Sequence, residues 1–273
     1  MAADFVVPES FVFERVGEHR YRFDAVAGAD PGYVIFGGQL LAQMLLASAA
    51  SVPAKALKSI QALFVRGGDV SEAVDIELEP LHNGRSFASV NVAVRQSERL
   101  CATALVLLHA PEDDGIRHVP PMPDIEGPER AVRLGPPGLV APGAEYRVVG
   151  GIDLWGEGDE TGPPELSVWL RWPPNRAPLA LNQAMLAFAT DGFLIGTAMR
   201  PHEGVGQHLA HARVATGVLS HAVYFHDPVP SGEWLLLAQA SPFAGGARAL
   251  GEGRVFREDG RLVATFVQES LIR

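Results

Sequence analysis

The chain has 273 residues, a net charge of −10 and 47% hydrophobic residues, which is enough material for a large buried core. It contains no block of basic residues, so its composition argues against nucleic acid or an anionic membrane surface as a partner. The single cysteine, Cys101, excludes an intramolecular disulfide and favours a reducing compartment. The N-terminus lacks the features of a signal peptide, and no run of about 18 apolar residues predicts a membrane span. We therefore expect a soluble, cytoplasmic protein.

The first 110 residues predict a hairpin, one buried helix and four strands, in that order. Alternating residues predict hairpin strands over 11–16 and 21–26, an apolar run predicts the helix over 39–51, and further strands are predicted over 60–66, 73–80, 86–95 and 100–109. Gly37 and Gly38 precede the helix, and Pro53 ends it.

Residues 111–143 are rich in proline and show no sustained periodicity, which predicts a linker. After it the first order of elements returns, with strands predicted over 145–149 and 166–172, a helix over 181–196, and strands over 214–225, 233–239, 247–256 and 262–269. The sequence therefore predicts two repeats, residues 1–110 and 144–273, joined by the linker.

Residue types support this duplication. Residues 100–105 match 262–267, residues 61–64 match 221–224, and Gln39 matches Gln183. In this register Ala47 corresponds to Asp191, and Val106 corresponds to Gln268. Two copies of one fold need the same core, so a difference confined to polar groups indicates chemistry in the second copy.

Asp191 is the one acid within the apolar stretch 181–196. A buried carboxylate without a partner costs several kcal/mol, so we expect it to be hydrogen-bonded, protonated or open to a pocket. The alternative is that Asp191 caps a following segment at Asp191-Gly192, where the helix ends and another turn begins, since aspartate is a common capping and turn residue.

Several motifs along the chain resemble the acyl-CoA thioesterase II family. They are Phe36-Gly37-Gly38-Gln39, the segment 64–69, the segment 83–87, His221 to His226 before Pro228, and the terminal segment 268–273. The resemblance covers nearly the whole chain, with the motifs in the expected order. It implies an α+β double hotdog fold: two tandem repeats, each an antiparallel sheet wrapped around a long apolar helix.

The resemblance also implies hydrolysis of acyl-CoA by a water held between an Asp, a Thr or Ser, and a Gln. The Asp falls on Asp191 and the Gln on Gln268, whereas Val218 stands at the position of the hydroxyl residue. Thr216, two residues upstream, is a candidate substitute, and Ser220 is another only after a shift of register. A carboxylate suits the role of general base, and an amide suits the orientation of a water.

Substrate-binding candidates fall into two groups. Backbone N–H groups of Gly37, Gly38 and Gln39 at the helix start are candidate oxyanion donors. Arg66, Arg85 and Arg248 are candidates for the CoA phosphates, although arginines beside turns are often simply solvated. His202, His208, His211, His221 and His226 cluster in the sequence, but without a metal-binding motif we expect no metal and no cofactor.

Two functions stay open on the sequence. One is an acyl-CoA thioesterase with an altered water site, working as a homo-oligomer. The other is an acyl-CoA-binding or scaffolding protein that keeps the fold and has lost catalysis. Val218 separates them, because restoring Thr there is expected to raise kcat unless Thr216 already supplies the hydroxyl.

Overall fold

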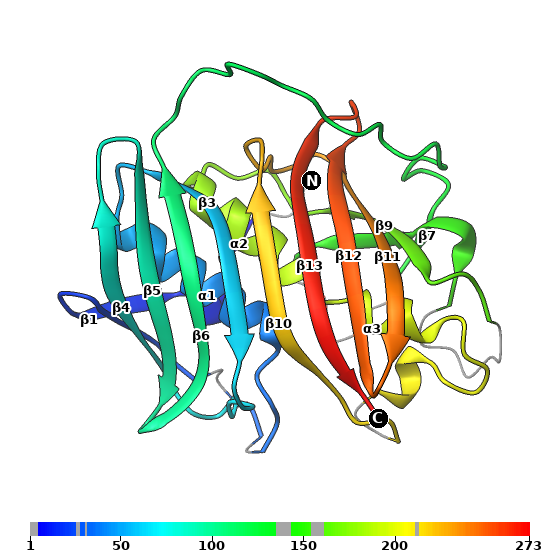
Figure 1. Ribbon diagram of the computed structural model, residues 1–273, viewed down its shortest axis with the longest axis horizontal. Coiled ribbons are helices and arrows are strands. Elements are labelled where there is room, and N and C mark those ends of the chain that lie inside the picture. The colour runs from blue at the N-terminus through cyan, green and yellow to red at the C-terminus, as the bar shows by residue number, and fades with distance from the viewer. Residues whose placement is uncertain (1–4, 26–27, 31, 135–142, 154–160, 211–212) are drawn as a thin grey trace.

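The computed structural model describes residues 5–25, 28–30, 32–134, 143–153, 161–210 and 213–273. The described residues form one antiparallel sheet of 13 strands with the long helices on one side of it (Figure 1), in the order β1-β2-β4-β5-β6-β3-β10-β13-β12-β11-β9-β8-β7. The first half contributes β1 (Phe13–Gly17), β2 (Arg20–Phe23), α1 (Gly37–Ser51), β3 (Ala56–Phe64), β4 (Val74–Asn83), β5 (Phe87–Gln96) and β6 (Arg99–His109). The second contributes β7 (Val132–Arg133), β8 (Glu145–Val148), β9 (Glu165–Arg171), α2 (Leu179–Thr190), α3 (Leu194–Met199), β10 (Thr216–Phe225), β11 (Leu235–Gly245), β12 (Arg248–Arg257) and β13 (Leu262–Ile272).

The two halves join edge to edge. Strand β3 pairs antiparallel with β10, with Ala62 opposite His221 and Ser59 opposite Tyr224. On the inner side of this seam, α1 packs against α2, and both helices are buried on nearly every face. Alanine and leucine dominate both helices. Each helix can therefore pack against the sheet and against the other helix without burying many unpaired polar groups. The predicted double hotdog arrangement is confirmed.

The prediction of a single helix over 181–196 is wrong in one respect, because the structure has two helices there. α2 ends at Thr190, and α3 begins at Leu194 after a turn in which the Gly192 N–H bonds to Ala189 O. The segment Leu179–Met199 is long and apolar enough to cross a membrane, but 83% of its most apolar 18-residue stretch is buried inside the protein. It is therefore the core of this fold.

The predicted linker is not wholly irregular. Val132 and Arg133 form β7, which pairs with β8 at the edge of the second half, and Ala131 is buried beside Trp169. Residues 135–142 of the predicted linker, like Val26 and His211, lie outside the described residues. The long excursion from β6 to β7 passes over one end of the sheet (Figure 1).

Candidate active site

Asp191 lies at the C-terminal end of α2, where the helix breaks. Its backbone is still helical (φ −84°, ψ −11°), and it is the C-cap of α2, so the predicted helix end at Asp191-Gly192 is confirmed. Asp191 does not cap the following helix, whose N-cap is Phe193. Its side chain is nevertheless buried, and Oδ2 accepts a hydrogen bond of 2.7 Å from the Gly38 N–H at the start of α1. The positive end of the α1 dipole thus faces a carboxyl group carried by the other half.

The Gly37-Gly38 pair is explained by this contact between helix ends. A Cβ on Gly38 would lie 2.5 Å from the carbonyl oxygen of Phe188, and a Cβ on Gly37 would lie 2.8 Å from Asp191 Oδ2. Only glycine lets the start of α1 approach the end of α2 this closely. The Gly38 N–H therefore holds Asp191, and the Gln39 N–H bonds to Phe36 O, so neither amide points freely at a ligand as the oxyanion hypothesis required.

His221 stands between Asp191 and Gln268. Its Nδ1 lies 2.8 Å from Gln268 Oε1 and 3.7 Å from Asp191 Oδ1, while Nε2 lies 3.0 Å from the Thr190 hydroxyl. Because an amide oxygen only accepts, the proton of the neutral ring lies on Nδ1. The single proton of the Thr190 hydroxyl is then shared between Nε2 and the Ala187 carbonyl oxygen, 2.8 Å away. Oδ1 of Asp191 has no hydrogen-bond partner among the described residues. The sequence placed His221 in a family motif and in a group of histidines, but gave no sign that it lies between Asp191 and Gln268.

Burial sets the protonation states of the Asp191 carboxyl group and the His221 imidazole. It raises the pKa of Asp191 to about 8, against a smaller opposing effect of the Gly38 N–H. It lowers the pKa of His221 to about 4, against a smaller opposing effect of its hydrogen bond to Gln268. At neutral pH the imidazole is therefore uncharged, and the carboxyl group is mostly protonated and becomes a base as the pH rises.

A bulge in β10 decides which side chains face this cluster. The pairing with β13 shifts between Val218 and Ser220, so that Val218 lies opposite Ser270, Ser220 opposite Glu269, and His221 opposite Gln268. Val218 therefore shares the inner face with His221. Ser220 lines the outer face, which removes it as a substitute hydroxyl.

Thr216 also lies on the inner face, opposite Ile272. It is one pleat beyond Val218 and so farther along the strand from His221. The residue directly opposite Val218 is Ser270, which is buried, and its Oγ accepts a hydrogen bond of 2.8 Å from Gln268 Nε2. Ser270 is not among the candidates taken from the sequence, although the period-two alternation of a strand puts residues 268 and 270 on one face.

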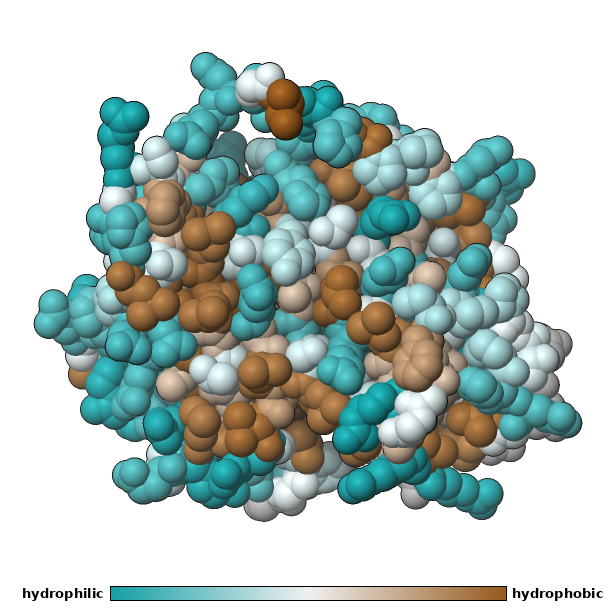
Figure 2. Space-filling model, viewed as in Figure 1, coloured by the Kyte–Doolittle hydropathy of each residue, from teal (hydrophilic) through white to brown (hydrophobic). Residues whose placement is uncertain are grey.

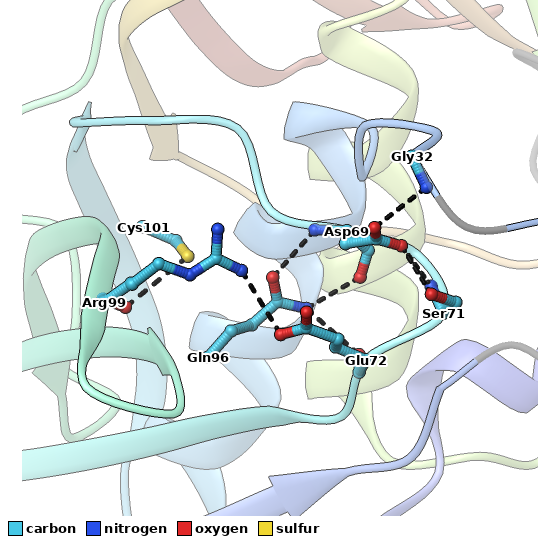
Figure 3. Close-up of polar contacts among 7 residues, drawn as sticks. All are labelled: Gly32, Asp69, Ser71, Glu72, Gln96, Arg99 and Cys101. Atoms are coloured by element: carbon cyan, nitrogen blue, oxygen red, sulfur yellow. Dashed lines mark hydrogen bonds and ion pairs between the residues drawn. The ribbon is translucent and has the colours of Figure 1, made fainter.

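The approach to α1 is fixed by a polar network in the first half (Figure 3). The Gln96 amide, fully buried, accepts from the Asp69 N–H and donates to the carbonyls of Asp69 and Glu72. The Asp69 carboxylate accepts from Gly32 N and from the backbone and hydroxyl of Ser71, which keeps its pKa low. The Ile35 N–H bonds to Gly68 O, so this loop also holds the segment that leads into Gly37 and Gly38.

The three candidate arginines are all exposed but do not lie together. Arg66 follows β3, and Arg248 begins β12 opposite Leu271, which puts both at the Gln268 end of the sheet. Arg85 lies in the β4–β5 turn at the other end, a strand length of roughly 30 Å away. A cavity of about 310 Å³ adjoins Arg248 and is lined by Met199, His202, Val205 and Ile272. Among the described residues, no group of three or more His, Cys, Asp or Glu side chains is placed to hold a metal.

The architecture and the buried cluster define a double hotdog protein with a buried polar site in its second half. Residues 26–109 match the family described as "Acyl-CoA thioesterase N-terminal domain", and residues 117–272 match "Acyl-CoA thioesterase C-terminal domain". The chain belongs to the acyl-CoA thioesterase family, as the sequence motifs indicated.

Named relatives agree with this assignment. The chain is 31% identical to acyl-CoA thioesterase 2 of Haemophilus influenzae over 88% of its own length and 87% of the relative. It is 28% identical to human acyl-coenzyme A thioesterase 8, covering 89% of this chain and 82% of the relative. The crystal structure of the acyl-CoA thioesterase II TesB2 from Mycobacterium marinum is similar with a TM-score of 0.80, 28% identity and 98% coverage of both chains.

Proposed function

We propose that the chain hydrolyses acyl-CoA thioesters to a free fatty acid and CoA, with water as the nucleophile. The family and the names of the relatives support this reaction class. The observation that carries the proposal is the junction at His221, where Asp191 Oδ1 and Gln268 Oε1 both face the same ring nitrogen in a buried site.

In the proposed mechanism, Asp191 is the general base. The water oxygen attacks the thioester carbonyl carbon while Asp191 Oδ1, which has no protein partner among the described residues, takes a proton from the water. The tetrahedral intermediate collapses, the C–S bond breaks, and the proton passes to the departing CoA thiolate. The Gly38 N–H keeps Oδ2 in place, so only Oδ1 faces the water. Gln268 orients the water, and His221 positions Gln268 through its Nδ1–H.

The CoA end of the substrate is proposed to lie at the sheet end that carries Arg66 and Arg248. Both guanidinium groups are exposed there, and guanidinium suits bidentate contact with phosphate. Gly37 lies at the same end of the site, next to Asp191 Oδ2 and the Phe64 ring. Arg85, in the β4–β5 turn, is too remote to bind the same phosphates.

A steady-state assay over acyl-CoA chain lengths tests the proposal. The expected result is turnover by the wild-type protein that is lost in Asp191→Asn while acyl-CoA binding remains. The alternative, a binding or scaffolding protein, predicts that acyl-CoA binds to the wild type without turnover. Val218 is the observation that favours this alternative, since it removes a hydroxyl from β10.

We also propose that the protein is a homo-oligomer that associates through the outer face of the sheet at the seam. A hollow of about 520 Å³ there is lined by residues without a fixed charge, including Leu63 (59% exposed), Leu105 (52%), Tyr224 and Val267. Figure 2 shows apolar patches among polar side chains on this face. For a chain of net charge −10, a hollow lined by uncharged side chains is a place where two copies meet with little repulsion.

Sedimentation of Leu105→Glu tests this association. The wild type is expected to sediment as a dimer or larger, and the variant as a monomer. Ile116→Glu, at an 89% exposed residue of the segment after β6, serves as the matched control and should leave the assembly intact. A monomeric wild type would contradict the proposal.

Finally, we propose a cytoplasmic location. The one cysteine is a buried free thiol, and burial raises its pKa, which suits a reducing compartment without requiring it. Cell fractionation with antibody detection tests this location, and recovery in the membrane or secreted fraction would contradict it.

A further inference from the structure

A hydroxyl that the family pattern places on β10 is absent from this chain, and a buried hydroxyl stands directly opposite on β13. Val218 and Ser270 are paired residues in the antiparallel ladder. Ser270 is 3% exposed, and its Oγ lies 2.8 Å from Gln268 Nε2. The two residues are therefore neighbours on the inner face of the sheet, and side chains at both positions can contact the same atom.

The alternation of β13 explains why Ser270 reaches the site. Gln268 and Ser270 are both buried, whereas Val267 and Glu269 between and beside them are exposed. The bulge in β10 keeps Val218 on this same buried side. Of the two substitutes that the sequence suggested, Ser220 faces outward, and Thr216 is one pleat farther from His221. Ser270 is the hydroxyl residue nearest in register to the missing one.

The fold does not require a hydroxyl at this place. The equivalent ladder pair of the first half is Leu57 and Leu108, both buried and both apolar. A serine in a core position where the other copy has leucine loses apolar burial and must satisfy its hydroxyl. Its hydrogen bond to Gln268, a residue of the proposed site, indicates that the serine belongs to that site.

We propose that Ser270 supplies the hydroxyl contact to the reacting water that Val218 cannot make. Because Oγ accepts from the Gln268 amide, Ser270 keeps its own proton and a second lone pair for the water. Ser270 forms no covalent bond with the substrate. It holds the water while Asp191 takes the proton, the oxygen adds to the carbonyl carbon, and the C–S bond breaks. This inference rests on the proposed hydrolysis of acyl-CoA.

The first experiment compares Ser270→Ala with Ser241→Ala in the full-length protein. Ser241 is another buried serine of the same sheet, and its hydroxyl bonds only to the carbonyls of Phe243 and Leu250 among the described residues. Both changes remove a buried hydroxyl, so both are expected to lower the melting temperature slightly. Only Ser270→Ala is expected to lower kcat, by about tenfold or more with little change in KM, because it acts on the water and leaves substrate binding intact.

The second experiment restores the hydroxyl on the neighbouring strand. In the double variant Val218→Thr/Ser270→Ala, kcat is expected to recover most of the loss caused by Ser270→Ala alone. A serine that served only the fold would not be rescued in this way. Wild-type kcat in folded Ser270→Ala, or no recovery in the double variant, overturns the inference while the proposed hydrolysis stands. Absence of turnover in the wild type instead overturns the proposed function and this inference together.

Discussion

Strands β6 and β13 occupy equivalent places in the two halves, and their burial patterns are identical from Cys101 to Leu108 and from Val263 to Ser270. The inward residues differ in kind. The first half has Val106 and Leu108 where the second half has Gln268 and Ser270. The same sheet thus folds with apolar residues at these positions in one copy, so the polar residues of the other copy are not there for the fold.

The neighbouring strands, β3 and β10, show the same difference between the halves. β3 carries a bulge between Leu57 and Ser59, as β10 does between Val218 and Ser220, and Ile60 pairs with Val106 as His221 pairs with Gln268. The helices differ as well, since α1 runs unbroken through Ala47 while α2 ends before Asp191. One half contributes the Gly38 N–H, and the other half carries Asp191, His221 and Gln268, the polar groups of the proposed site.

The largest expected effect is that of Asp191→Asn, which removes the group the first half lacks. We expect kcat to fall by about 10³-fold with the fold intact, since a general base contributes about 10²- to 10⁴-fold. For the wild type, kcat/KM should rise with pH toward a plateau above about 8, the pKa to which burial raises Asp191. Asp259→Asn, exposed in the turn after β12, is the control and should retain wild-type kcat. A folded Asp191→Asn with wild-type kcat/KM would remove Asp191 from the mechanism.

The stability of Asp191→Asn is expected to depend on pH differently from that of the wild type. Between the ordinary pKa of 3.8 and the folded value of about 8, folded Asp191 holds a proton that the unfolded chain has lost. Its contribution to the free energy of unfolding is therefore fully present below the ordinary pKa and is lost as the pH rises through the folded value. The Asp191→Asn variant has no such loss, so from pH 4 to 8 it should gain stability relative to the wild type by on the order of a few kcal/mol. The free energies of unfolding of both proteins are measured by urea unfolding from pH 4 to 8. If the two values changed in parallel with pH, the raised pKa of Asp191 would be contradicted.

Exchanging the polar pair of the second half for that of the first should abolish activity without abolishing the fold. Each single change, His221→Ile or Gln268→Val, leaves a buried polar partner unsatisfied and is expected to cost about 1–3 kcal/mol. The double variant recreates the Ile60–Val106 pairing, so its cost should be well below the sum of the two. Activity should fall by about 10²-fold or more in all three variants, since each removes a group that positions the water. Additive stability losses would contradict the equivalence of the halves.

A smaller effect is expected in the scaffold half. Gln96→Met removes the amide that holds the Asp69 loop, so the segment leading to Gly38 loosens and the N–H that fixes Asp191 is displaced. We expect kcat to fall by about tenfold, because small displacements of catalytic groups are costly. Gln43→Met, at a buried glutamine of α1 that donates to Ser10 O, is the matched control and should lower stability alone. Equal effects of the two variants on kcat would leave the loop without a positioning role.

The sequence predicted the fold well because periodicity and residue type repeat in both halves, and most strands lie within a few residues of their predicted bounds. The exceptions are β11, which runs past the predicted end at 239 to Gly245, and the helix predicted over 181–196, which is two helices. The site was harder, because it depends on register. Matching 61–64 with 221–224 is off by one residue, since the structure sets Ile60, and not Gln61, at the place of His221. A shift of one residue reverses the face of every side chain in a strand, which hid the role of His221. The bulge that selects Ser270 leaves no signal in composition.

The smallest expected effect is that of Val218→Thr alone, where the sequence analysis expected a gain. If Ser270 already provides the contact, a second hydroxyl opposite it adds little, and kcat should change by less than about threefold. The new hydroxyl enters a partly buried place beside Ser270, so stability is expected to change by about 1 kcal/mol or less if the two hydroxyls bond to each other. Steady-state kinetics and thermal unfolding of this single variant measure both quantities. A rise in kcat of about tenfold would show instead that residue 218 limits catalysis, and that the second half of this chain is a weakened copy of the family site and not a rearranged one.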